Sequence, residues 1–245
     1  RCAMSDVSGT SGESSAVYTA GVRHGLLQLL VALVARITVI HTLDSSGAVH
    51  SLGEGPGLTF DETFNVQMGV YHVRAAQQYG LALLSFDSLR EIFGADVYNP
   101  DHPPLCRVLI GLAHELSWPL LNPDVPPDAV AVTCGRVASA CGFALTIFLI
   151  GWMTSRWFGQ LAGLIAALSL VLMPRLFAHG HIAALETLIG LIYAATVLYV
   201  ADRWSGGRKP SWRAVLVGGT LFGLALLTKI QAVLLPIPIA IWALW

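Results

Sequence analysis

The chain of 245 residues is 55% hydrophobic and only 12% charged, and its formal net charge is −1 at pH 7. Soluble domains carry about twice that share of charged residues, so this composition argues against one large water-soluble core. A net charge near zero gives no indication of nucleic-acid binding or of an electrostatic surface partner. Long apolar runs alternate with short polar segments, and this arrangement predicts several membrane spans.

The N-terminal residues 1–22 are polar and rich in Ser, Gly and Thr, and we expect them to form a disordered cytoplasmic tail. The apolar run that follows lacks a small-residue cleavage site, and further apolar runs succeed it. These features favour a retained signal anchor over a removed signal peptide. The chain ends inside an apolar run, so we expect it to be the N-terminal part of a longer protein.

Five segments come near the length of about 20 apolar residues that a helix needs to cross a bilayer. They are residues 25–43, 130–151, 158–177, 182–201 and 213–235. The prolines at the end of the last segment, Pro236 and Pro238, allow a break into two spans there. The predicted fold class is therefore an all-α, polytopic transmembrane helical bundle.

A long polar connection, residues 44–129, joins the first two spans. Within it, segments 60–80 and 103–121 repeat apolar residues at helical spacing. Neither segment is long or apolar enough to span a membrane. We therefore predict two interfacial helices that lie along the membrane surface within this large first loop.

The short connections are basic, which orients the bundle. Arg156 lies between the second and third spans, and residues 202–213 form a basic connection between the fourth and fifth. Together with Arg1 and Arg23 near the N-terminus, they predict a cytoplasmic N-terminus and an extracytoplasmic loop 44–129. We expect an integral protein of a bacterial plasma membrane.

The first candidate for chemistry is Asp61-Glu62, at the start of the first loop helix. Together with Thr59 it also matches a capping box, and acids in a first helical turn are favoured by the helix dipole. The functional interpretation is a carboxylate base at the membrane surface, held ionised by the helix N-terminus. Spacing alone leaves both interpretations open.

The second candidate is Asp101-His102, which precedes Pro103-Pro104. A turn followed by a helix start explains the prolines well and the Asp-His pair less well. Either side chain is able to bind a metal or a phosphate-bearing substrate.

Three ionisable residues, Arg136, Glu186 and Lys229, fall inside predicted spans. A charge at a helix centre costs roughly 2.5–3.5 kcal/mol on insertion scales, so each needs an ionic partner or a function. Under the predicted topology all three lie toward the outer side, on the face that carries Asp61. We expect these four residues to meet in one polar pocket beneath the loop helices.

The turn between the third and fourth predicted spans is also polar and on the outer side. It holds Arg175, His179 and His181, for which solvation of a loop is the simpler account. An outer cavity that combines a carboxylate with cations suits a lipid-linked anion whose apolar tail stays in the bilayer.

The motifs, in their order and placement relative to the spans, resemble the GT-C glycosyltransferases, within the branch of dolichyl-phosphate-mannose protein mannosyltransferases and aminoarabinose transferases. The residues that carry the resemblance are Asp61-Glu62 after the first span, His102-Pro103-Pro104-Leu105 in the loop, Gly135-Arg136-Val137 with Ser139 in the second span, and Leu227-Thr228-Lys229 followed by Leu235-Pro236. The resemblance covers residues 25–240. It implies that residues 23–245 are the N-terminal part of a transmembrane glycosyltransferase domain.

This resemblance implies an inverting transfer of a sugar from a polyprenyl phosphate to a lipid, glycan or protein acceptor. Asp61 would be the general base, accompanied by Glu62, while the residues expected to bind substrate and phosphate are His102, Arg136, Glu186 and Lys229. Relatives often have Asp where this chain has Glu186. Some use a divalent metal and others none, so that question stays open. Members have more spans, so we expect this piece alone to be inactive.

Two other classes of protein are compatible with the sequence. A secondary transporter would place Arg136, Glu186 and Lys229 at mid-depth in broken helices, with no large loop above them. A non-catalytic membrane protein would keep the fold alone and bind no polyprenyl phosphate.

Overall fold

The computed structural model describes residues 10–55, 57–94, 102–126, 128–204 and 210–244. Across these ranges the chain is helical and contains no strand, so the predicted all-α class is confirmed. The α-helices are α1 (Thr10–His41), α2 (Phe60–Tyr79), α3 (Phe86–Phe93), α4 (Leu105–Leu121), α5 (Val132–Phe158), α6 (Gln160–Val171), α7 (Pro174–His179), α8 (Leu185–Trp204), α9 (Trp212–Thr228) and α10 (Pro236–Leu244). Two short 3₁₀ helices complete the described chain: η1 (Gly80–Leu84) connects α2 to α3, and η2 (Ile230–Leu234) connects α9 to α10.

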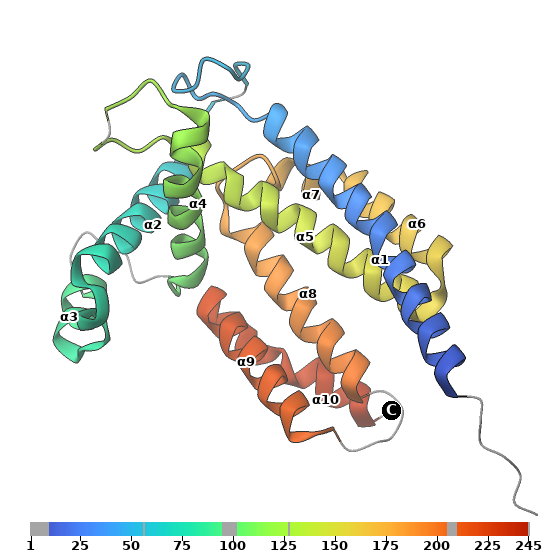
Figure 1. Ribbon diagram of the computed structural model, residues 1–245. Helices are drawn as coiled ribbons and strands as arrows, with labels where there is room; N and C mark the ends of the chain where they lie inside the picture. The colour runs from blue at the N-terminus through green and yellow to red at the C-terminus, as the bar shows by residue number, and fades with distance from the viewer. Residues whose placement is uncertain (1–9, 56, 95–101, 127, 205–209, 245) are drawn as a thin grey trace, which may run out of the picture.

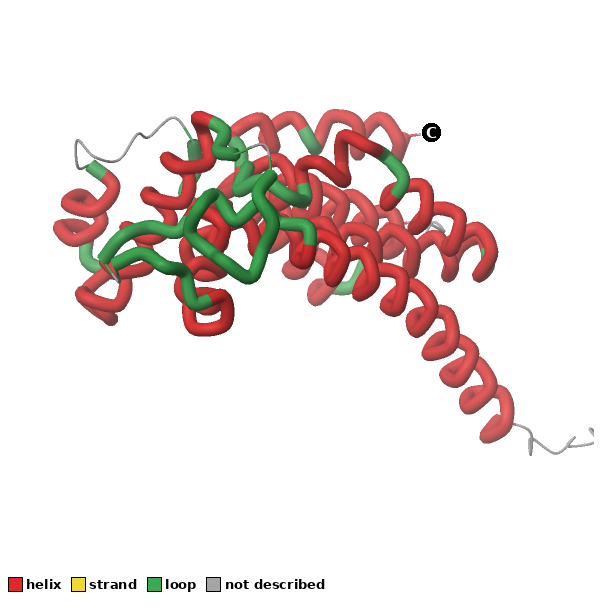
Figure 2. The backbone as a smooth tube through the Cα atoms, turned by 90° about the horizontal axis from the view of Figure 1, so that it is seen from above, coloured by secondary structure: helices red, strands yellow, loops and turns green. Residues whose placement is uncertain are grey.

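The apolar helices form a bundle, and the loop helices α2, α3 and α4 gather at one end of it (Figure 1). Helix α5 lies at the centre and packs against α1, α4, α6 and α8. Seen from above, the longest loop segments lie toward the end that holds α2 to α4, and α1 extends away from it (Figure 2). The main core cluster joins α1, α5 and α6 around Val39, Phe143 and Ile147.

Two helices of the described chain, α5 and α8, are long and apolar enough to cross a membrane. The apolar helices Gly25–His41, Gln160–Val171, Trp212–Thr228 and Ile230–Trp242 are shorter. The predicted span 158–177 is divided, because Met173 adopts an extended conformation and Pro174 begins a new helix. The last predicted span ends earlier than Pro236, at Thr228, where Lys229 is extended.

Helix α1 begins at Thr10, so residues 10–22, which we predicted as part of a disordered tail, belong to this helix. Lengthening an existing helix costs little compared with nucleating one, and Ala16 and Ala20 favour the helical state. Residues 1–9 lie outside the described ranges.

The two basic connections meet at one end of the bundle. An ion pair joins Arg156 Nη2 to Asp202 Oδ1 at 3.4 Å, and Trp157 Nε1 donates to the same oxygen at 3.3 Å. The loop helices lie at the other end, beside the start of α5 (Figure 1). This arrangement agrees with the predicted separation of basic connections from the long loop.

The crossing of α2 and α4 depends on two glycines, Gly69 and Gly111, that face each other. A Cβ atom on Gly69 would overlap the carbonyl oxygen of Arg107, and one on Gly111 would overlap the backbone of Gly69. Since both obstacles are backbone atoms, neither is able to move aside. These glycines therefore set the close approach of the two helices that wall the candidate site.

Gly69→Ala is expected to destabilise the protein by about 1–3 kcal/mol, the usual cost of overpacking a filled interior. Thermal unfolding in detergent measures this loss as a lower melting temperature. Gly219→Ala in α9 is the matched control, because a Cβ there meets open space. An unchanged melting temperature for Gly69→Ala would show that the crossing tolerates a methyl group.

Candidate active site

A half-open cavity of about 430 Å³ lies where the first turns of α2, α4 and α8 meet. Its lining residues are Phe60, Asp61, Phe64, Asn65, His102, Arg107, Ala184, Leu185 and Glu186. Segments more than a hundred residues apart in the sequence thus build one polar site. The cavity brings together three predicted site residues, Asp61, His102 and Glu186.

Two carboxylates face the cavity from different walls. Asp61 stands in the first turn of α2 and Glu186 in the first turn of α8. Both side chains are exposed, so each is accessible to a substrate in the cavity. The cavity is therefore lined by two carboxylates that come from two different helices.

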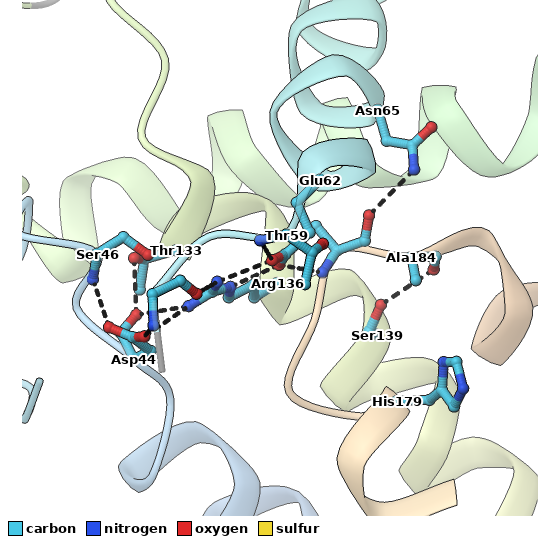
Figure 3. Close-up of polar contacts among 12 residues, drawn as sticks. Asp44, Ser46, Thr59, Glu62, Asn65, Thr133, Arg136, Ser139, His179 and Ala184 are labelled. Atoms are coloured by element: carbon cyan, nitrogen blue, oxygen red, sulfur yellow. Dashed lines mark hydrogen bonds and ion pairs between the residues drawn. The ribbon is translucent and has the colours of Figure 1, made fainter. Parts of the chain in front are cut away.

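Glu62, next to Asp61, is turned the other way and is fully buried. Its carboxylate accepts hydrogen bonds from Arg136 Nε at 2.7 Å and from Arg136 Nη2 at 2.9 Å, so the two side chains form a bidentate ion pair (Figure 3). The same carboxylate accepts hydrogen bonds from the backbone N–H groups of Thr59 at 2.9 Å and Ala183 at 2.8 Å. Burial alone would raise the pKa of Glu62, but these bonds to Arg136 and the backbone outweigh it, so the pKa lies below its ordinary value.

Arg136 is the buried centre of this network and is 1% exposed. Besides Glu62, its guanidinium donates to the carbonyl oxygen of Asp44 at 3.0 Å and to that of Gly57 at 2.9 Å (Figure 3). One side chain on α5 thereby holds the segment that enters the loop and the first turn of α2. Through Glu62 it also reaches Ala183, just before α8. The network consequently sets the relative position of the two walls that carry Asp61 and Glu186.

Arg107 supplies a cation that the sequence analysis did not single out. It lines the cavity although it is only 2% exposed, its Nε donates to Asn65 Oδ1 at 3.3 Å, and its guanidinium lies 4.8 Å from the centroid of the Phe64 ring. A signal was present in the sequence, because Arg107 is a lone basic residue in the first turn of an apolar helix that follows Pro103-Pro104. His102 lines the same cavity, whereas Asp101 lies outside the described residues.

The expected meeting of four residues in one pocket occurs only in part. Arg136 and Lys229 are absent from the residues that line the cavity of Asp61 and Glu186. Arg136 instead pairs with Glu62, because a buried guanidinium needs a carboxylate at hydrogen-bond distance. Lys229 ends α9 in an extended conformation and is half-buried, and its carbonyl oxygen accepts a hydrogen bond from the Tyr193 hydroxyl at 3.5 Å.

A second, mainly apolar cavity of about 150 Å³ adjoins the first and shares Glu186 with it. Its walls come from α5 to α8, namely Phe143, Thr146, Ile147, Leu170, Arg175, Leu176, His179, Glu186, Thr187 and Gly190. Arg175 is exposed and His179 half-buried. The buried Nδ1 of His179 has no hydrogen-bond partner among the described atoms. The turn that we interpreted as solvated thus places a guanidinium and an imidazole beside an apolar space.

The third residue of that turn, His181, has a structural role. Its two ring nitrogens lie 2.8 Å from the Thr42 hydroxyl and 2.8 Å from the Phe177 carbonyl oxygen. It thereby ties the turn after α7 to the end of α1. Over the ranges that the structure describes, no three His, Cys, Asp or Glu side chains are grouped so that they would hold a metal ion.

Comparison with known proteins gives a family. A family model described as dolichyl-phosphate-mannose-protein mannosyltransferase matches residues 101–245, which is more than half of the chain. No curated protein and no solved structure shows a significant match. The matched region includes the walls of both cavities that come from α4 to α8. The resemblance to this family is confirmed over residues 101–245, and Asp61-Glu62 lies before the matched region.

Proposed function

Since the chain belongs to the dolichyl-phosphate-mannose-protein mannosyltransferase family, and is thereby an integral membrane glycosyltransferase of the GT-C type, we propose that it transfers a sugar from a polyprenyl phosphate to an acceptor on the extracytoplasmic face. The transfer inverts the configuration of the sugar carbon. The observation that carries this proposal is the cavity that Asp61 and Glu186 line together with His102 and Arg107.

The two adjoining cavities suit the two halves of a lipid-linked donor. The apolar cavity of Phe143, Ile147 and Leu170 accommodates the first part of a prenyl chain, and the polar cavity accommodates the sugar. The phosphate then lies near Glu186, between the cations of the two cavities. Arg175 is exposed there and able to approach it, and guanidinium groups bind phosphate oxygens with paired hydrogen bonds.

In the proposed reaction Asp61 takes the proton of the acceptor hydroxyl while that oxygen attacks the anomeric carbon. The bond from this carbon to the phosphate oxygen breaks, and its electron pair leaves with the polyprenyl phosphate. One displacement from the opposite face inverts the configuration, so no covalent enzyme intermediate forms. Cations beside the leaving phosphate stabilise the charge that it gains.

Glu62 and Arg136 act in this proposal as positioning residues, because their charged atoms face each other in the interior. Lys229, at the end of α9, remains a proposed contact for the donor phosphate from outside the described cavity. A transporter would need such charges at mid-depth with no loop above them. The first-turn position of Glu186 and the loop helices beside it favour the transferase.

Donor and stereochemistry are tested with the full-length protein in proteoliposomes, supplied with a polyprenyl-phosphate mannose of known anomeric configuration and manno-oligosaccharide acceptors. We expect transfer with the opposite configuration in the product, read by nuclear magnetic resonance, and none from a nucleotide-linked mannose. Retention of configuration, or equal use of the nucleotide sugar, would contradict the proposal.

A further inference from the structure

One face of α2 carries a continuous row of aromatic and hydrogen-bonding side chains, here called the α2 track. Its members are Phe60, Phe64, Gln67, Tyr71, Arg74 and Gln78. They recur at alternating intervals of four and three residues, so they lie on one side of the helix. From first to last the track is about 27 Å long, at 1.5 Å per residue.

The track is only partly covered by the rest of the protein, since Phe64, Tyr71 and Arg74 are half-buried. The most deeply buried residues of α2, such as Glu62 and Val66, lie outside the track. On the track, Phe60 is 94% exposed, and Gln67 and Gln78 are exposed as well. Within the protein, Phe64 lies against the Arg107 guanidinium and the Tyr71 hydroxyl donates to the Ile92 carbonyl oxygen at 3.3 Å. Apolar burial does not explain Phe60.

The two ends of the track line two cavities. Phe60 and Phe64 belong to the cavity of Asp61. The remaining four members line another half-open cavity, of about 480 Å³, together with Val70, Ala75, Tyr79, Glu91, Ile92 and Val130. The second cavity begins six residues after Asp61, about 9 Å further along the helix. One helix face thus leads from the candidate reaction site to a second binding space.

We infer that the α2 track binds the acceptor, and that this acceptor is an extended saccharide chain whose growing end lies at Asp61. Aromatic rings offer flat apolar faces to sugar rings, while amide and guanidinium groups hydrogen-bond to hydroxyl groups. The track carries aromatic rings at Phe60, Phe64 and Tyr71, and its hydrogen-bonding side chains, Gln67, Arg74 and Gln78, lie among and beyond them. The inference rests on the proposed function for the direction of the chain, since Asp61 marks the reacting end.

The other contacts of this space favour a neutral saccharide over an anion or a peptide. Arg74 is already paired, with its Nε 3.2 Å from Glu115 Oε1, and Glu91 adds a negative charge to the wall. One common way to hold an extended peptide is pairing with the free backbone groups of a sheet edge. The described walls are helices and short connections, and the backbone groups of a helix are satisfied within it.

Binding is tested with neutral manno-oligosaccharides of increasing length, by calorimetry on the full-length protein in detergent. We expect affinity to rise with length, because a longer chain contacts more of the track. The double variant Gln67→Ala/Gln78→Ala should bind the longest chain about tenfold more weakly and the disaccharide unchanged, since two amide hydrogen bonds are lost far from Asp61. Both glutamines are exposed, so folding should be unaffected.

Gln77→Ala is the matched control, because Gln77 is exposed on α2 but does not line this cavity. Affinity that is independent of length, tighter binding of a Ser/Thr-rich peptide, or an equal loss in Gln77→Ala would overturn the inference. Asp61→Asn separates the two proposals. If Asp61→Asn stops transfer but affinity does not rise with saccharide length, Asp61 remains the proposed base and only the α2 track inference is contradicted. If Asp61→Asn still transfers sugar and affinity does rise with saccharide length, the α2 track inference stands and the assignment of Asp61 as the base is contradicted.

Discussion

Replacement of Asp61 by Asn is expected to lower the rate of sugar transfer by about 10²–10⁴-fold, the contribution that a general base typically makes. Asn has the same size but does not accept the proton of the acceptor hydroxyl. Asp61 is exposed and lines the cavity, so the substitution should leave the fold intact. The loss should therefore appear in kcat, with binding of the donor unchanged.

The measurement is transfer from a polyprenyl-phosphate sugar by the full-length protein in proteoliposomes, with donor binding determined separately. Asp128→Asn is the matched control, since Asp128 is an exposed acid of the same loop that does not line the cavity. Asp61→Asn with activity within a few-fold of wild type would remove Asp61 as the base. Glu186, which lines the same cavity from α8, would then be the next carboxylate to test.

Breaking the buried pair of Glu62 and Arg136 is expected to have the largest effect on stability. Glu62→Gln leaves the guanidinium of Arg136 buried without its carboxylate, and loss of one partner from such a pair costs about 3–5 kcal/mol. Thermal unfolding in detergent should show a clearly lower melting temperature. The matched control is Glu115→Gln, which removes a partly exposed partner of Arg74 and should cost about 1 kcal/mol or less.

The pair also makes stability depend on pH. Because the pKa of Glu62 is lower in the folded protein than in the unfolded chain, its contribution is complete above the unfolded pKa of about 4.3. It is lost as the pH falls through the folded pKa. Wild type should consequently lose stability in this acidic range more steeply than Glu62→Gln. Parallel pH profiles of the two proteins would contradict this interpretation.

A double variant separates stability from positioning. Glu62→Leu with Arg136→Met replaces both charges by apolar groups and should recover part of the stability that Glu62→Gln loses. The recovery is incomplete because the N–H groups of Thr59 and Ala183 lose their acceptor. Transfer should nevertheless stay low, because the entry segment at Asp44 and Gly57 is then no longer tied to the turn that carries Asp61. Recovery of both stability and transfer would show that the pair is only structural.

The loop helices were predictable because their signals are local. The segment 60–80 was predicted as a helix from its periodic apolar residues, and α2 extends from Phe60 to Tyr79. The segment after Pro103-Pro104 likewise became α4. In contrast, α3 is only eight residues long, too short for a periodic pattern to stand out. The division of α6 from α7 depended on the conformation of Met173, which the hydrophobic run did not reveal.

The partners of the charged residues were not predictable in the same way. The Thr-x-x-Glu spacing predicts a capping box between Thr59 and Glu62, and the Glu62 carboxylate does accept the Thr59 N–H group. Spacing alone did not show that Glu62 also pairs with Arg136. Glu62 and Arg136 are 74 residues apart. Which of two adjacent acids meets Arg136 depends on how α2 is rotated against α5, and no local pattern in the sequence determines that rotation.

The sequence by itself determined that the chain is an all-α membrane protein, where its loop helices begin, and which motifs link it to a glycosyltransferase family. These properties follow from hydrophobic runs, helical periodicity and prolines, all of which act over a few residues. Only the tertiary structure decided that Arg136 pairs with Glu62 and that Arg107 joins Asp61, His102 and Glu186 around one cavity. The physical reason is that a charge in the interior takes whichever partner the packing of distant helices brings within hydrogen-bond distance.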